Sequence, residues 1–306
     1  MTIKHLVISG GGPSGIKALG ALQQLEKNKF WNIDEIQTIY ATSAGAIMGL
    51  LIALRFEWDV INDYIIKRPW HDTYHLSVNQ IFEAYSKKGL FDEKVISIFY
   101  KPFFDSKDLS MKITMKEFYE YSKIEVHFFS LELNNFELID ISYKTHPDLE
   151  LLRALHMTIA LPLVISPVCI DDKCYVDAGM ISNYPLNYCI KNNNCPFEEI
   201  LGFRNSYENS EICNNIVNNE STILDYIMTF INKMISTLDT ETKQPVIPNE
   251  VSYKTKHMSI SFIKETASSS ETRLELLNDG IKTAEDFLSL KREEEVKTNV
   301  ETKDNE

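Results

Sequence analysis

The chain has 306 residues, of which 44% are hydrophobic and 25% are charged, values typical of a globular protein that exclude wholesale disorder. Its net charge is −13, and because an acidic surface repels phosphate we expect no nucleic-acid partner. The apolar run near the N-terminus is too short for a signal peptide, and no stretch approaches the roughly 18 apolar residues of a membrane-spanning helix. We therefore expect a cytoplasmic protein without a transmembrane segment.

The N-terminal third predicts an α/β fold. A short buried strand is predicted at residues 3–9, around the apolar run Leu6-Val7-Ile8, and a glycine-rich turn covers residues 10–15. A helix is predicted at residues 16–29, a second strand at 36–40 and a second helix at 46–56. This repeated strand–turn–helix order predicts a mostly parallel or mixed central sheet with helices on both faces.

Further along the chain, residues 57–122 are predicted to be mainly helical, with breaks at Pro69 and Pro102. Additional strands are predicted at residues 125–131, 136–142, 164–170, 173–177, 200–203 and 258–263. Additional helices are predicted at residues 149–160, 221–238 and 271–290, with a polar loop at 205–220. Residues 291–306 hold six acids, four bases and only two apolar residues, and predict a disordered tail.

The cysteines predict neither a disulfide framework nor a metal site. Five are present, an odd number, and no two of them form a Cys-x-x-Cys pair. We expect all of them to be free thiols in a reducing compartment. No group of cysteine and histidine has metal-ligand spacing, so no metal is expected. The cysteines are Cys169, Cys174, Cys189, Cys195 and Cys213.

The turn Gly10-Gly11-Gly12-Pro13-Ser14-Gly15 matches G-x-G-x-x-G between a strand and a helix. Glycine permits close backbone approach, so the turn suits either a dinucleotide or an oxyanion held by main-chain amides. A dinucleotide site needs an acidic residue at the end of the second strand. The nearby acids, Asp34 and Glu35, precede that strand instead, so an oxidoreductase is a remote alternative.

The second strand ends in Ala41-Thr42-Ser43-Ala44-Gly45, one substitution away from G-x-S-x-G. Small residues around a serine permit the sharp strand-to-helix turn that exposes a nucleophilic hydroxyl, and the amide of Ala44 can then stabilise an oxyanion. The alternative is that Ser43 is only the N-cap of the following helix.

A third motif, Tyr175-Val176-Asp177-Ala178-Gly179, is followed by Asn183 and Pro185. Taken in order, the three motifs resemble those of the patatin-like phospholipases. The resemblance covers residues 3–203 and implies a three-layer α/β fold, with residues 204–290 as a variable helical end of the same domain.

This resemblance implies a Ser–Asp dyad in which Ser43 is the nucleophile and Asp177 the general base. The oxyanion would be held by Gly11, Gly12 and Ala44. The implied substrate is a phospholipid or related lipid ester, cleaved without a cofactor or metal during transient contact with a membrane surface. The alternative for Asp177 is a turn-forming role.

Some residues depart from the family pattern. Ser14 stands where the family has Arg or Lys, and Lys17, one turn further on, is a candidate replacement for that charge. Alanine replaces glycine at positions 41 and 178, which leaves a decayed lipid- or protein-binding module as an alternative. Of the histidines, only His257 follows Asp177 as a Ser–Asp–His triad requires, and its charged surroundings predict an exposed side chain instead.

Overall fold

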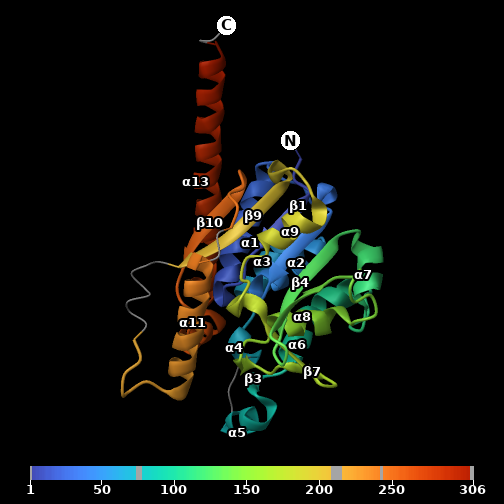
Figure 1. The fold of residues 1–306 in the computed structure, drawn as a ribbon, viewed down its shortest axis with the longest axis vertical. Helices are drawn as coiled ribbons and strands as arrows, with labels where there is room; N and C mark the ends of the chain where they lie inside the picture. The colour runs from blue at the N-terminus through green and yellow to red at the C-terminus, as the bar shows by residue number, and fades with distance from the viewer. Residues whose placement is uncertain (1, 74–77, 208–215, 242–243, 304–306) are drawn as a thin grey trace.

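A computed structural model describes residues 2–73, 78–207, 216–241 and 244–303, and its central feature is an eight-stranded mixed sheet (Figure 1). The strand order is β10-β9-β1-β2-β4-β8-β7, with β5 also paired to β4. Strands β10, β9, β1, β2 and β4 run parallel, whereas β5, β7 and β8 pair in antiparallel fashion. The strands are β1 (His5–Ile8), β2 (Thr38–Thr42), β4 (Glu125–Glu132), β5 (Glu137–Ile141), β7 (Val168–Ile170), β8 (Lys173–Asp177), β9 (Ile200–Tyr207) and β10 (Glu250–Thr255).

Helices cover both faces of this sheet, as the sequence predicted. In β1, Leu6 and Ile8 point into one core, whereas Val7 points into a second core on the opposite face. The first core lies beneath α1 (Gly15–Lys27), α2 (Ala44–Ala53), α8 (Leu151–Ile159) and α13 (Ser270–Lys303). The second lies beneath α9 (Leu186–Asn193). Helix α2 is apolar all round because it is buried on every side.

The segment between β2 and β4 is mainly helical. It holds α3 (Trp58–Lys67), α4 (Trp70–Thr73), α5 (Val78–Lys87), β3 (Gly89–Phe91), α6 (Lys94–Ser106) and α7 (Met115–Ser122). Its part from α4 to β3 lies at the lower end of the molecule in Figure 1. The predicted break at Pro69 is confirmed, but the one at Pro102 is wrong, because Pro102 lies inside α6. Its missing N–H leaves the Ile98 carbonyl without a helical donor, and the Tyr64 hydroxyl lies 3.5 Å from that oxygen and 2.7 Å from the Phe99 carbonyl.

Two predicted strands differ from the structure. The strand predicted at residues 258–263 is wrong, because helix α12 (Ile260–Ser268) begins there. The Ser259 hydroxyl caps this helix by accepting a hydrogen bond from the Phe262 amide at 3.1 Å. The strand of this region is β10, which ends at Thr255. Alternate residues of β10 face the core, which is the pattern of a half-buried strand. The run at 164–170 is divided at Pro167 into β6 (Leu163–Ile165), which pairs with β3 in a separate sheet, and β7.

The C-terminal end and two cysteines also differ from expectation. The tail predicted from residue 291 is helical as far as Lys303, because glutamate and lysine favour helix and pair along its surface, as Lys291 and Glu294 do at 3.2 Å. Cys169 and Cys174 face each other across β7 and β8 and form a disulfide, so the prediction of free thiols is wrong for these two. Cys189 and Cys195 are free, and Cys213 lies outside the described residues.

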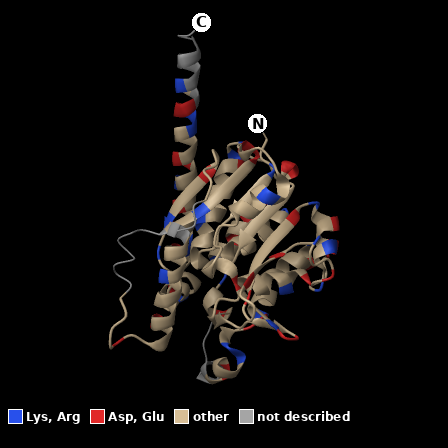
Figure 2. Ribbon diagram, in the orientation of Figure 1, with Lys and Arg blue, Asp and Glu red and all other residues tan. Residues whose placement is uncertain are grey.

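Figure 2 shows Lys and Arg residues interspersed with Asp and Glu residues along the chain, including α13. Within the part of the chain that the structure describes, no helix combines the length and hydrophobicity needed to cross a membrane. The loop predicted at residues 205–220 is wrong for residues 205–207, which belong to β9, and residues 208–215 of that prediction lie outside the described residues.

Helices α1 and α13 cross at two glycines. A Cβ atom on Gly20 would lie 2.1 Å from the carbonyl oxygen of Leu277, and one on Gly280 would lie 1.9 Å from that of Lys17. Real Cβ atoms do not approach backbone so closely, so this helix crossing requires glycine on both sides.

We expect Gly20→Ala to lower the free energy of unfolding by about 1–3 kcal/mol, although alanine is intrinsically the better helix former by about 1 kcal/mol. Chemical denaturation measures the change. Lys27→Ala, at the exposed end of α1, is the control and should change stability by less than about 0.5 kcal/mol. A Gly20→Ala protein more stable than the parent contradicts the close crossing.

Candidate active site

Ser43 occupies the sharp turn between β2 and α2. Its backbone adopts φ 54°, in the left-handed region that non-glycine residues rarely enter. Its side chain makes no capping hydrogen bond to α2, so the simple N-cap alternative does not describe it. The turn is close-packed, because a Cβ on Gly45 would lie 2.5 Å from the Ile8 carbonyl, and the Ser43 amide donates to the Thr158 hydroxyl at 3.0 Å.

The register of β4 brings the third motif to this turn. β5 pairs with the last five residues of β4, so β2 and β8 must share the other edge of that strand. β2 reaches as far as Thr42, opposite Phe129, and β8 arrives from the other direction and ends at Asp177, opposite Ser130. The ends of β2 and β8 therefore meet at consecutive positions along β4, although 134 residues separate Ser43 and Asp177.

The two side chains form a buried hydrogen bond. The Ser43 hydroxyl donates to Oδ2 of Asp177 at 2.6 Å, and the Gly179 amide donates to Oδ1 at 2.7 Å. Oδ1 of Asp177 therefore stabilises the turn, as the alternative interpretation expected, while Oδ2 contacts the serine. Asp177 is only 2% exposed, and this desolvation raises the pKa of its carboxyl to about 6, although the hydrogen bonds from Ser43 and Gly179 lower it.

The glycine loop lies against the same turn. Gly10 passes so close to Ser43 that a Cβ on it would lie 2.9 Å from the serine Cβ. Side-chain amides of Asn183 and Asn205 donate to the Gly10 carbonyl at 3.2 and 3.1 Å, which fixes the loop. Asn205, placed in a loop by the sequence analysis, lies in β9 and is a contact that the sequence did not reveal.

Three amides predicted to hold an oxyanion lie at helix starts. Gly11 and Gly12 open a short 3₁₀ turn at residues 12–14, and Ala44 opens α2, so no carbonyl of their own helices can accept from these amides. Gly12, Pro13 and Ala44 line the pocket above Ser43. Gly11 is outside that lining, with its α-carbon facing the Asn205 side chain.

Ser14 and Lys17, at the departures from the family pattern, lie away from the contact between Ser43 and Asp177. Ser14 is buried and its hydroxyl pairs with that of Thr255 in β10. Lys17 does not replace the missing charge, because its amine donates to the Lys254 carbonyl at 2.9 Å and lies 3.2 Å from Asp279, in a different cleft. This expectation is therefore wrong.

The two alanines that stand where the family has glycine are packed in the hydrophobic cores. Ala41 is fully buried in the core below α2, and Ala178 is fully buried in the core on the opposite face. Neither lines the pocket. At Gly15 and Gly179 a Cβ would approach Ala44 Cβ at 3.1 Å and an Asp177 oxygen at 3.0 Å, so these positions remain tight.

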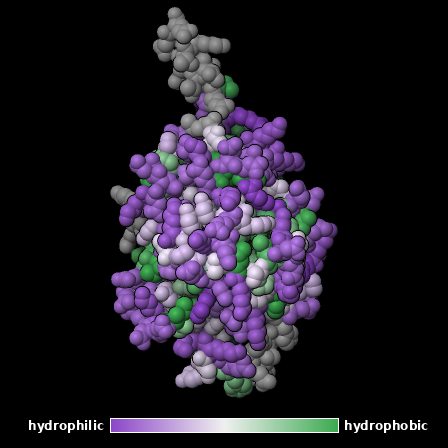
Figure 3. All heavy atoms as spheres, turned by 90° about the vertical axis from the view of Figure 1, so that its right-hand side faces the viewer, coloured by the Kyte–Doolittle hydropathy of each residue, from purple (hydrophilic) through white to green (hydrophobic). Residues whose placement is uncertain are grey.

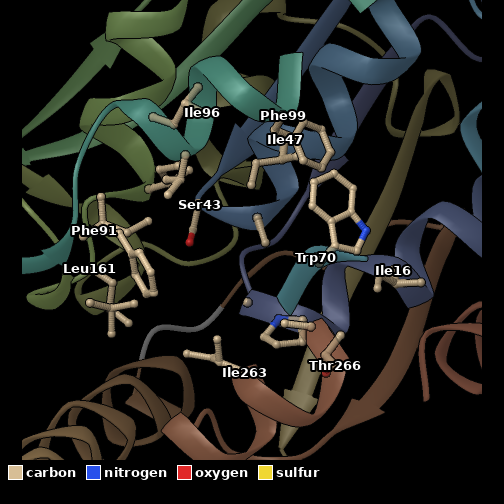
Figure 4. Close-up of a pocket in the computed structure, with 18 of the residues that line it drawn as sticks. Ile16, Ser43, Ile47, Trp70, Phe91, Ile96, Phe99, Leu161, Ile263 and Thr266 are labelled. Atoms are coloured by element: carbon tan, nitrogen blue, oxygen red, sulfur yellow. The ribbon is translucent and has the colours of Figure 1, made fainter. Parts of the chain in front are cut away.

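A cavity of about 230 Å³ opens above Ser43 and is lined mainly by apolar side chains. Figure 4 shows Ser43 at its centre, with Phe91 on one side, Trp70 on the other and Ile263 of α12 below. These residues lie in separate elements with no shared motif, so the sequence analysis did not identify them. Other apolar members of the lining are Ile16, Ile47, Ile96, Phe99, Leu161 and Val164.

Arg273, the cationic residue of the cavity wall, is 3% exposed. Its guanidinium donates to the carbonyls of Ile66 and Arg68 at the end of α3, at 2.6 and 3.0 Å. It also donates to Thr266 and Ala267 near the end of α12, at 2.7 and 3.0 Å. The arginine thereby joins the end of α3 to that of α12 and holds one wall of the cavity in place.

The position of His257 differs from the prediction. His257 is half-buried, not exposed as predicted, and lies outside the cavity lining, although the neighbouring Met258 belongs to it. In the described ranges, no three or more His, Cys, Asp or Glu side chains are arranged to hold a metal ion. The polar centre of the cavity is therefore the contact between Ser43 and Asp177.

A serine on a strained strand-to-helix turn, hydrogen-bonded to a buried carboxylate in an apolar cavity, is the arrangement found in serine acyl hydrolases. The sequence model of the patatin-like phospholipases matches residues 6–190, which include all three motifs. This chain belongs to the patatin-like phospholipase family.

Individual proteins are also similar to this chain. The chain is 27% identical over 191 residues to a probable lipid hydrolase, 463L, of Invertebrate iridescent virus 6, and 25% identical over 186 residues to an uncharacterized protein, R571, of Acanthamoeba polyphaga mimivirus. The matches span 62% and 60% of this chain, and 64% and 60% of the viral proteins. The crystal structure of VipD from Legionella pneumophila shares the fold, with a TM-score of 0.59 at 14% identity over 94% of this chain and 67% of that one.

The raised pKa of Asp177 predicts a cost in stability. Between pH 4 and 6 the unfolded chain loses this proton while the folded chain keeps it, so ionisation at higher pH destabilises the fold. We expect Asp177→Asn, which keeps the shape and removes the charge, to raise the free energy of unfolding by up to ~3 kcal/mol at pH 7–8. The gain should vanish below about pH 4. Denaturation across this pH range tests it, and a gain independent of pH contradicts the assignment.

Proposed function

We propose that this chain is a lipid acyl hydrolase in which Ser43 is the nucleophile and Asp177 the general base. The observation that carries the proposal is the 2.6 Å hydrogen bond between these two side chains at the base of an apolar cavity. A carboxylate whose pKa is about 6 is ionised at neutral pH and is a stronger base than an ordinary aspartate. It can therefore accept the serine proton as attack occurs.

In the acylation step, Ser43 Oγ attacks the ester carbonyl carbon and its proton passes to Oδ2 of Asp177. The tetrahedral intermediate collapses, the bond to the leaving alcohol breaks, and Asp177 returns the proton to the alcohol oxygen. Water then attacks the acyl-serine carbonyl and Asp177 takes one proton from it. When the acyl–Oγ bond breaks, that proton returns to Ser43 and the fatty acid leaves.

The amides of Gly12 and Ala44, with that of Gly11, are the donors proposed for the oxyanion. Ala44 directly follows the nucleophile at the positive end of α2, where a negative oxygen is stabilised. Pro13 has no N–H, so the 3₁₀ turn can contribute donors only from the residues around it.

The cavity favours an acyl chain as the group next to the reacting carbonyl. Its lining is mainly hydrocarbon and aromatic rings, which exclude water and match a fatty acyl tail. The substrate class that we propose is therefore an acyl ester of a phospholipid or related lipid. The similarity to a viral protein named as a probable lipid hydrolase supports this choice.

We expect Ser43→Ala to lower hydrolysis of a soluble p-nitrophenyl ester and of phospholipid by at least ~10³-fold, because no nucleophile remains. A fluorophosphonate probe should label the parent at Ser43 and leave the variant unlabelled. Ser252→Ala, an exposed serine on β10, is the matched control and should keep full activity and labelling. Near-full esterase activity of Ser43→Ala would refute the assignment, and a parent that takes no label would indicate a decayed binding module.

The pH profile of kcat/KM reports the base in the free enzyme. We expect kcat/KM for the soluble ester to rise with pH around an apparent pKa of about 6 and to level off above it, because only ionised Asp177 can accept the proton. Initial rates between pH 4.5 and 8 measure this. A midpoint that stays near 4 would show that the base is an unperturbed carboxyl.

A further inference from the structure

Two helices border the walls of the Ser43 cavity without lining it. Helix α5 lies in the chain between Trp70 of α4 and Phe91 of β3, which both belong to the lining. Helix α11 (Ile223–Glu241) is joined to another wall, because the side-chain amide of Asn232 donates to the carbonyl of Met258 at 2.7 Å. In Figure 1, α5 and the first residues of α11 lie at the same, lower end of the molecule.

Each of these helices presents large apolar side chains to solvent. On α5, Phe82 and Tyr85 are one turn apart and 76% and 94% exposed. On α11, Ile223, Tyr226 and Phe230 follow the spacing i, i+3, i+7, which places them on one face, and their exposures lie between 55% and 74%. We call these five residues the rim surface.

The rim surface is not the ordinary packing face of either helix. The opposite face of α11 buries Met228, Ile231 and Ile235, so this helix is apolar on two sides. A helix on the surface of a globular protein needs only one apolar face, which packs against the protein core. A second apolar face that is exposed to solvent indicates contact with another surface. Figure 3 shows hydrophobic atoms at the lower tip of the molecule, where α5 lies, below a largely hydrophilic face.

Charges near the rim surface almost balance, in contrast to the net charge of −13 for the whole chain. On α5, Lys87 lies 2.8 Å from Glu83 and 3.6 Å from Asp92, so its charge is compensated locally. Over residues 223–233, α11 carries one acid, Asp225, and one base, Lys233. Such a surface is not attracted to anionic lipids, and its aromatic residues are of the kind that settle at the boundary between head groups and acyl chains.

We propose that the rim surface docks on a zwitterionic lipid surface and places the cavity entrance against the substrate layer. The inference rests on the proposed lipid hydrolase function and adds to it the part of the molecule that meets the lipid. Docking there lets an acyl chain pass from the layer to the Ser43 cavity with little exposure to water. Because insertion of apolar side chains supplies the binding free energy, attachment should depend little on salt.

The test uses the full chain carrying Ser43→Ala, so that the vesicles stay intact, and measures partitioning to phosphatidylcholine vesicles by flotation. Phe82→Ser, Tyr85→Ser, Ile223→Ser and Phe230→Ser together should lower the partition coefficient at least about tenfold. Leu290→Ser with Val296→Ser, at comparably exposed positions of α13 (61% and 62%), is the control and should leave partitioning unchanged. Raising salt from about 0.1 to about 0.5 M should have little effect.

The same four substitutions in the chain with Ser43 intact should leave hydrolysis of a soluble ester within about twofold of the parent, which shows that fold and site are preserved. Vesicle binding that survives the four substitutions overturns the proposal, as does binding that needs phosphatidylserine and disappears at high salt. A dimer dissolved by the four substitutions would instead make the rim surface a protein interface. Activity retained by Ser43→Ala would refute the proposed catalytic role and leave this binding result unaffected.

Discussion

The site depends on one buried hydrogen bond, which the Ser43 hydroxyl donates to the Asp177 carboxylate. A carboxylate excluded from water is costly, and the cost is limited by two donors, the serine hydroxyl and the Gly179 amide. The residual penalty is what raises the pKa of the carboxyl. The same burial that weakens the fold at neutral pH therefore supplies the basicity that the proposed chemistry requires.

The strands of the sheet hold this contact in place. Ser43 and Asp177 each follow or end a strand that shares one edge of β4, so main-chain hydrogen bonds set their separation. Strain at Ser43 is retained because Gly45 packs against the end of β1 and the Thr158 hydroxyl binds the Ser43 amide. Rigid elements on both sides thus keep a short hydrogen bond that two flexible loops could not maintain.

The residues proposed to react and part of the cavity wall come from different parts of the chain. The serine, the aspartate and the glycine loop lie within residues 6–190, the part matched by the family. The cavity above Ser43 is completed by Met258, Ile263 and Arg273, which lie beyond that part. Arg273 uses its guanidinium to join two helix ends, which makes a buried cation a structural element of an otherwise apolar wall.

The α/β class and most strands and helices of the N-terminal two thirds could be predicted from the sequence, because glycine-rich turns and apolar periodicity are local signals. The candidate pair Ser43 and Asp177 came instead from the resemblance of three ordered motifs to those of a known family. The sequence could not determine the register along β4, the cavity lining or the role of Arg273, since these depend on contacts between distant segments. The same limit explains the errors: β10 and α12 were misplaced where short apolar runs fit either structure, and the Cys169–Cys174 pair formed because adjacent antiparallel strands brought two thiols opposite each other. These features depend on tertiary packing, because residues far apart in the sequence come into contact only in the folded chain.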